Sequence, residues 1–291
     1  MSKVTNNENY DDLFVPEKMP TTCLLCIDGA LSELGHIIPK LALRWLKRAS
    51  KLNTFYFNNN PNIKISDTPA FKMMCEKCED KISTLEKDFT DNYFKRYYKH
   101  QPVSKPRDEL YIFAISVAWR LIISTERLKD TQSHIKPYKE IYSNLEFRMH
   151  NLLNNNQNKC NIGVYVFSAD EILNNLQEVQ IKRNLLLYSL RHGLKAHNLY
   201  SKDGTFLISN SHVPTVFFKI GFYYFLVVET GYFDSVQFSV KSIKASESYE
   251  LFEVKYTEDF LGFLDWLMEH GLYEANISPP SLKHYDRRNY Y

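Results

Sequence analysis

Apolar residues recur at helical spacing after Pro39, and proline is a residue type that fits the first turn of a helix. The helix predicted here has one apolar face, which comprises Leu41, Trp45, Ala49 and Leu52. It also has a basic face, which comprises Lys40, Arg44, Lys47 and Lys51, with Arg48 nearby. Residues 53–68 are polar and include Asn58-Asn59-Asn60-Pro61, so the pattern predicts a loop there.

Three further helices are predicted before residue 154. The first starts near Lys72 or Cys75 and runs to about Lys99, with apolar positions at Ile82, Leu85, Phe89 and Tyr93. Residues 108–128 form the second, which is apolar nearly all round and is therefore expected to be buried. Residues 136–153 form the third.

Arg120 stands in the middle of the predicted buried helix. A guanidinium stays charged at neutral pH, and a buried charge needs a partner of opposite sign. Glu86 and Asp88, on the preceding predicted helix, are both candidates for that partner.

The second half of the chain changes character. Asn161 to Phe167 reads as a strand, and Thr215–Ile220 with Phe222–Thr230 reads as an antiparallel hairpin around Gly221. Helices are also expected over residues 170–195 and 257–270, and a short strand over residues 205–208. The fold class is therefore α+β, with a mostly helical first half and an α+β second half that contains an antiparallel sheet.

Polar segments suggest how the chain is divided. Asn154-Asn155-Asn156-Gln157-Asn158 is the best candidate for a boundary. We expect a disordered segment at residues 1–20, a helical domain at 21–153, an α+β domain at 161–280 and a basic, aromatic tail at 281–291.

Composition gives an ordinary globular profile, with 44% hydrophobic and 24% charged residues. The formal net charge is only +2, so any surface that attracts nucleic acid must be local. Residues 1–20 lack the apolar region of a signal peptide, and the longest apolar run, residues 111–123, is too short to span a bilayer. We therefore expect a cytoplasmic protein without membrane contact, whose cysteines stay reduced.

Four of the five cysteines form two C-x-x-C pairs, namely Cys23 with Cys26 and Cys75 with Cys78. The fifth, Cys160, stands alone and is read as a free thiol. Two such pairs can supply four thiolates to one tetrahedral zinc ion, and the second pair stands at a predicted helix start, where the helix dipole favours thiolates. The sequence therefore predicts a structural zinc site.

The residues around and between the pairs resemble a known family. C-x-x-C, then His36-Ile37-Ile38-Pro39-Lys40, then C-x-x-C-E at a helix start is similar to the HNH group of His-Me finger nucleases. The likeness is closer to HNH-like proteins of bacteria and phages, and Ser32, residues 36–40 and residues 75–79 carry it. The resemblance implies a zinc-bound ββα, treble-clef-like finger at the start of the first domain.

In that group, a histidine in the first strand is the general base that activates water. The residue just before it and a histidine after the last cysteine hold a catalytic divalent metal. Here His36 matches the base, but Gly35 and Glu79 stand at the two positions of the metal ligands. Glu33 and Glu79 could act as substitute oxygen ligands for Mg²⁺ or Mn²⁺.

The resemblance and its departures imply a non-catalytic, zinc-stabilised binding protein. Its place would be in phage–host conflict, as an inhibitor or a component of a defence complex. DNA or a protein complex would be the partner, and the basic face formed by Lys40, Arg44, Lys47 and Lys51 suits phosphate contacts. One alternative is an active HNH-like endonuclease with His36 as general base. Another is an assembly protein whose aromatic second half forms a homo-oligomer.

Overall fold

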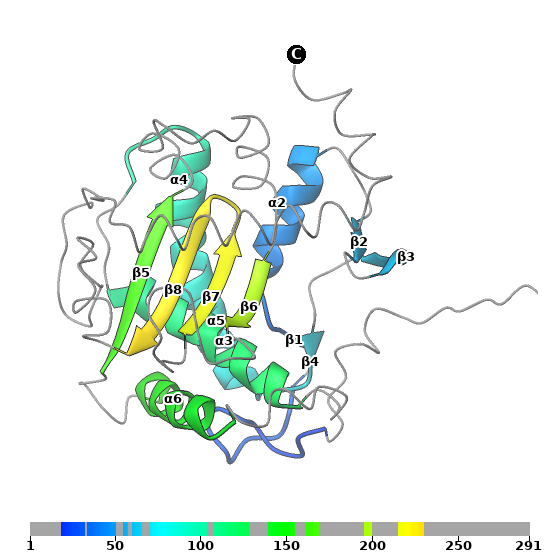
Figure 1. Cartoon of the computed structure of the whole chain (residues 1–291), viewed down its shortest axis with the longest axis vertical. Helices are drawn as coiled ribbons and strands as arrows, with labels where there is room; N and C mark the ends of the chain where they lie inside the picture. Colours follow the sequence, from blue (N-terminus) through cyan, green and yellow to red (C-terminus); the bar gives the residue numbers. More distant parts are fainter. Residues whose placement is uncertain are drawn as a thin grey trace, which may run out of the picture.

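The computed structural model describes ten segments of the chain, which are residues 19–32, 34–50, 55–57, 60–65, 70–103, 108–127, 139–154, 161–168, 195–199 and 215–229. These segments form helices and antiparallel sheets, so the predicted α+β class is confirmed (Figure 1). None of the described helices is long and apolar enough to cross a membrane.

The first elements after the leading cysteines are small. Strand β1 (Gly35–His36) pairs antiparallel with β4 (Ala70–Phe71), although 33 residues lie between them in the chain. Helix α2 (Lys40–Ser50) begins directly after Pro39, as predicted. Leu41 and Trp45 of its apolar face pack against the core, together with the buried Leu43.

The loop predicted over residues 53–68 is wrong in part. Strands β2 (Phe55–Phe57) and β3 (Asn60–Ile65) form an antiparallel hairpin with Phe55 opposite Ile65 and Tyr56 opposite Lys64. The run of three aromatic residues has high strand propensity, and cross-strand pairing outweighs the polarity of the neighbouring asparagines.

The long helix predicted from Lys72 or Cys75 to Lys99 is confirmed, with one irregularity. Helix α3 (Glu76–Phe89) passes into a π-helical turn, η1 (Thr90–Phe94), and then into α4 (Lys95–Tyr98). The π-helical turn inserts an extra residue into the helical repeat, so it rotates the side chains that follow. This turn brings Phe94 against the tip of the sheet.

Helix α5 (Asp108–Arg127) runs through the middle of the molecule. Its side chains from Leu110 to Ser124 are buried except for the half-buried Ile112, as its nearly continuous apolar sequence predicts. Helix α6 (Lys139–Leu153) packs on α5, and the Lys81 ammonium of α3 donates a hydrogen bond to the last carbonyl of α6, that of Leu153.

The main sheet has four strands in the order β5-β8-β7-β6, and every neighbouring pair is antiparallel. The predicted first strand and hairpin appear as β5 (Ile162–Ser168), β7 (Thr215–Ile220) and β8 (Tyr223–Glu229). The hairpin turns at Gly221, whose φ of +57° favours glycine, and a Cβ atom there would overlap the Phe94 ring.

Strand β6 (Lys195–Leu199) corrects the prediction of helix as far as residue 195. Its sequence, Lys-Ala-His-Asn-Leu, has little strand propensity, so pairing with β7 decides its conformation. The predicted elements at 170–194, 205–208 and 257–270 lie outside the described residues, as do the segments 1–18 and 281–291.

Helix α5 lies against one face of the sheet, while α3 and α6 pack around the same helix (Figure 1). One hydrophobic core contains Cys23 and Leu25 near the start of the chain and Phe225 and Val227 in β8. The described residues on both sides of the segment 155–160 thus share this core. The domain boundary expected at residues 154–158 stays a prediction.

Candidate metal centre

The first cysteine pair stands in a compact turn. The Cys23 amide donates to the Gly29 carbonyl at 2.8 Å, and the Ile27 amide donates back to the Cys23 carbonyl at 2.9 Å. The Cys26 amide points at the Cys23 sulfur, with N and Sγ 3.4 Å apart. Ile27 adopts a φ of +68°, a left-handed conformation that is rare for a β-branched residue. The turn thereby directs both sulfurs to one side.

The second pair stands at the start of α3. Cys75 is the residue before the helix, with extended backbone, and its carbonyl accepts hydrogen bonds from the amides of Cys78 and Glu79 at 3.0 and 2.9 Å. Since residues three apart on a helix share a face, this first turn aligns the two thiols. The free amides of the helix N-terminus also favour negative charge on both sulfurs.

Backbone hydrogen bonds bring the two pairs together. The Leu24 amide donates to the Met73 carbonyl at 2.8 Å, and the Ser32 amide donates to the Met74 carbonyl at 2.9 Å. The Ser32 hydroxyl donates to that same Met74 carbonyl at 2.9 Å. Segment 23–32 is therefore held along residues 73–74, which directly precede the second pair.

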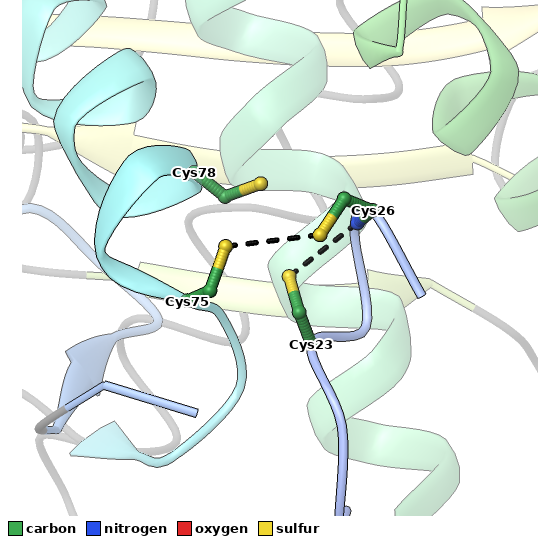
Figure 2. A group of neighbouring side chains, drawn as sticks. All are labelled: Cys23, Cys26, Cys75 and Cys78. Atoms are coloured by element: carbon green, nitrogen blue, oxygen red, sulfur yellow. Dashed lines mark hydrogen bonds between the residues drawn. The ribbon is translucent and has the colours of Figure 1, made fainter. Parts of the chain in front are cut away.

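The four sulfur atoms converge on one point (Figure 2). All of them lie within 4.8 Å of one another, and the Cys26 and Cys75 sulfurs are 3.7 Å apart. A tetrahedral zinc ion with Zn–S bonds of about 2.3 Å places its sulfurs about 3.8 Å apart. Cys23 and Cys78 are buried, Cys75 is half-buried and Cys26 is exposed. The cluster could hold a metal ion, and its geometry is compatible with zinc.

Gly29 shows how tightly the cluster is enclosed. A Cβ atom at this position would lie 2.7 Å from the Cys75 Cβ, 2.8 Å from the Cys75 sulfur and 3.3 Å from the Cys26 sulfur. Any other residue would therefore push the sulfurs apart. Sequence reasoning did not single out Gly29, although a glycine three residues after a C-x-x-C pair is a readable turn signal.

The surroundings shift the pKa values of the thiols in opposite directions. Hydrogen bonding from the backbone of Asp28 lowers the pKa of Cys26 to about 7. Burial raises the pKa of Cys75, and it raises the pKa of Cys78 far above its usual range. Close, partly buried thiols cannot all become thiolates without a cation between them, so the donor set fits a bound metal ion.

A second polar cluster lies behind β1. The Arg120 guanidinium, only 2% exposed, donates from Nη1 to the His36 carbonyl at 2.6 Å and to Glu86 Oε1 at 2.9 Å. The pairing of Arg120 with an acidic residue of α3 is thus confirmed, and Glu86 is that residue. The guanidinium joins β1, α3 and α5 at one point, although the hydrogen bond to His36 involves only the backbone.

Glu79 and Gly35, the two positions that depart from the HNH pattern, are in contact. A Cβ atom at Gly35 would overlap Glu79 Oε1, which is buried and has no hydrogen-bond partner among the described residues. Burial raises the pKa of Glu79, while the Arg120 charge acts in the opposite direction. The structure therefore brings Gly35 and Glu79 together, and the His36 side chain, next along β1, points to the other face of the strand.

The other predicted site residues lie elsewhere or outside the described residues. Lys40 and Lys47 on α2 are half-buried and Arg44 is exposed, and none of them belongs to the cysteine cluster. Glu33 and Lys51 lie outside the described residues, so their roles stay predictions. The backbone carbonyls of Met73 and Met74 hold the first cysteine pair beside the second. These carbonyls have no signal in the sequence, whereas Arg120, in the neighbouring polar cluster, had one as a charge within an apolar helix.

No protein-family model matches the chain, and searches of curated proteins and of solved structures return no match either.

Proposed function

We propose that the protein is a non-catalytic binding protein whose first predicted domain, residues 21–153, is organised by one structural zinc ion. The observation that carries this proposal is the convergence of the four cysteine sulfurs within 4.8 Å, from a turn and a helix start 49 residues apart. Four protein ligands complete a tetrahedral zinc shell, which leaves no open position for substrate or water. Such a site stabilises a fold without performing chemistry.

The order of the elements supports an HNH-like scaffold for this zinc site. Strands β1 and β4 form a two-stranded antiparallel sheet, and α3 follows β4 and contributes the second cysteine pair. A treble-clef-like finger combines a cysteine turn, two paired strands and a helix, and here α2 and the β2–β3 hairpin are inserted between the two strands. The proposed role in phage–host conflict, as an inhibitor or defence component, rests on the sequence resemblance.

The absence of catalysis is inferred from the surroundings of His36. Gly35 supplies no metal ligand, and the end of the Glu79 side chain occupies the space where a side chain at position 35 would begin. A divalent cation beside Glu79 would also feel the positive guanidinium of Arg120. A general base without a metal contributes roughly 10²–10⁴-fold, which is too little for phosphodiester cleavage.

One observation favours the alternative, an active metal-dependent endonuclease. Glu79 Oε1 is buried without a hydrogen-bond partner among the described residues, and it lies beside the strand that carries His36. Buried carboxylate oxygens normally have a partner, and a divalent cation is a suitable partner for such an oxygen. In this case Glu79 would replace the lost histidine ligand.

A cleavage assay decides between the two functions. The purified chain is incubated with plasmid, linear duplex and single-stranded DNA in the presence of Mg²⁺, Mn²⁺ or Ni²⁺. A nuclease of established activity serves as the positive control. We expect no cleavage with any metal, and we expect elemental analysis to give about one zinc per chain. Metal-dependent nicking that is lost in both His36→Ala and Glu79→Gln, with folding and zinc content unchanged, would make the protein an enzyme.

A further inference from the structure

Five aromatic residues join three separate elements at one end of the main sheet. Trp45 of α2 lies 4.6 Å from Phe222, at the β7–β8 turn, and 6.2 Å from Tyr98 of α4, measured between ring centroids. Tyr97 lies 4.9 Å from Phe222, and Phe94 lies 5.6 Å from Trp45. These contacts fix α2 beside α4, and Figure 1 shows both helices near the same end of the sheet.

The two helices that meet here are both basic. Helix α2, with the sequence KLALRWLKRAS, carries four basic residues and no acidic one. The segment from Lys95 to His100, KRYYKH, carries three basic residues and again no acidic one. The aromatic contacts therefore collect positive charge from two segments, although the whole chain has a net charge of only +2.

Much of this charge faces solvent. The side chains of Arg44 and Arg48 on α2 and of Arg96 and Lys99 on the other segment are exposed. Lys95 is neutralised by Asp91, with Nζ and Oδ1 2.7 Å apart, so this pair adds no net positive charge to the surface. Arg96 donates to the Pro102 carbonyl at 3.3 Å and, two residues before Tyr98 on α4, faces away from that ring.

Tyr98 stands at the seam between the two basic segments. It is 54% exposed although it is a large aromatic residue, and its ring packs beside Trp45 and Phe222, which contact each other and lie on the same side of it. The half-buried neighbours hold the ring in place, so its exposed part is a fixed aromatic surface. A fixed, exposed ring between two segments that carry exposed cations suits unpaired bases, because a base can stack on the ring while its phosphates meet the charges.

We propose that this surface, defined by Tyr98, Arg44, Arg48 and Lys99, binds single-stranded nucleic acid. The inference rests on the binding role proposed above and names the class of partner. Tyr98 stacks on a base, and the three cations contact the phosphates on either side of the seam. Duplex DNA keeps its base faces stacked within the helix, so it would leave the exposed tyrosine without a partner.

Fluorescence anisotropy of the full-length chain with a labelled oligothymidylate of about 20 nucleotides tests the proposal. A duplex of equal length and polyglutamate serve as competing probes. Tyr98→Ala is expected to weaken binding of the single strand roughly 5- to 100-fold, whereas Tyr98→Phe, which keeps the ring, is expected to change it less than about twofold. Melting temperature and zinc content verify that each variant is folded.

The charges are tested through the salt dependence of binding. The slope of log K against log salt concentration is negative for such binding. The double variant Arg44→Gln/Arg48→Gln is expected to make it shallower by about 1.4, since each phosphate contact of a single strand contributes about 0.7. The matched control Lys77→Gln/Lys87→Gln removes two exposed charges from α3 and should leave the slope unchanged.

Four outcomes would overturn the proposal: no binding of the single strand, tighter binding of duplex or polyglutamate, equal affinities of the two Tyr98 variants, or an equal slope change in the control. If Tyr98→Ala does not fold, the slope measurement on the arginine variant decides alone. A chain that carries zinc and cleaves nothing, yet binds no single strand, would contradict this inference and leave the zinc site of the proposed function standing.

Discussion

Residues 23–32 contain no helix or strand, whereas the twenty residues of α5 form a single helix that is buried over most of its length. The first segment is ordered by a few backbone hydrogen bonds and by the cysteine cluster. Helix α5 is ordered by apolar side chains that pack on the sheet, α3 and α6. The molecule thus combines two sources of stability, a cysteine cluster and an apolar core. Metal removal should affect the first, and core substitutions should affect the second.

The largest expected effect is the loss of a cysteine ligand. Cys78→Ser removes one of four proposed zinc ligands, and structural zinc contributes about 10 kcal/mol or more in small zinc-finger peptides. We expect the variant to lose its metal and to be protease-sensitive within residues 21–79. Elemental analysis combined with limited proteolysis measures this. The matched control is Cys160→Ser, which should keep both metal and resistance.

The next effect tests the apolar core. Phe113 of α5 is fully buried and stacks on Phe89 at 4.3 Å between ring centroids. Phe113→Ala should lower the free energy of unfolding by about 3–5 kcal/mol, because it removes buried surface and leaves a cavity. Urea denaturation measures the change, with Phe147→Ala, at a 62% exposed position, as the control. If a folded Phe113→Ala protein lost its zinc, the apolar core and the cysteine cluster would not be independent sources of stability.

A smaller effect is expected where the two regions meet. Arg120→Met keeps the length of the side chain but removes its hydrogen bonds to the His36 carbonyl and Glu86. We expect a loss of about 2–3 kcal/mol in the free energy of unfolding, because these are charge-assisted hydrogen bonds from a buried donor. The exposed pair Lys95–Asp91 gives the control, and Lys95→Gln should cost less than about 1 kcal/mol. An equal loss of unfolding free energy in Arg120→Met and Lys95→Gln would show that Arg120 does not link the two regions.

The smallest effect has the opposite sign. Ile27 is 66% exposed and adopts a left-handed φ, so its replacement loses little burial and relieves backbone strain. Ile27→Gly should raise the free energy of unfolding of the zinc-loaded protein by up to about 1 kcal/mol. The gain should disappear after metal removal, when the turn is no longer fixed. A gain that persists without metal would show that the turn does not depend on the cysteine cluster.

Sequence patterns anticipated the parts of the fold that depend on local signals. Helix α5 and the hairpin around Gly221 follow from continuous apolar residues and a glycine turn. A charge in an apolar helix predicts that Arg120 has an acidic partner, with Glu86 and Asp88 as candidates, and the structure selects Glu86. Strand β6 was missed because its pairing with β7, not its own sequence, decides its conformation. The hairpin of β2 and β3 was missed because the neighbouring asparagines indicate a loop, and this signal outweighed the strand propensity of three consecutive aromatic residues.

The candidate site shows the same division. Cysteine spacing indicates the four donors, because two C-x-x-C pairs whose thiols stay reduced are typical of a zinc site. Spacing does not indicate that Met73 and Met74 carbonyls hold the first pair against the second, because any residue supplies a carbonyl. Nor does it show that Gly35 contacts Glu79, since that contact depends on how β1 packs against α3.

Hydrogen exchange of the full chain, measured before and after treatment with a zinc chelator, tests the central claim most directly. The account predicts that metal removal increases exchange in residues 23–36 and 70–79, because metal binding and order are coupled there. Residues 113–122 and 223–228 should keep their protection, because buried apolar side chains hold them. Unchanged exchange at the cysteine segments, or an equal loss of protection in both regions, would contradict the account.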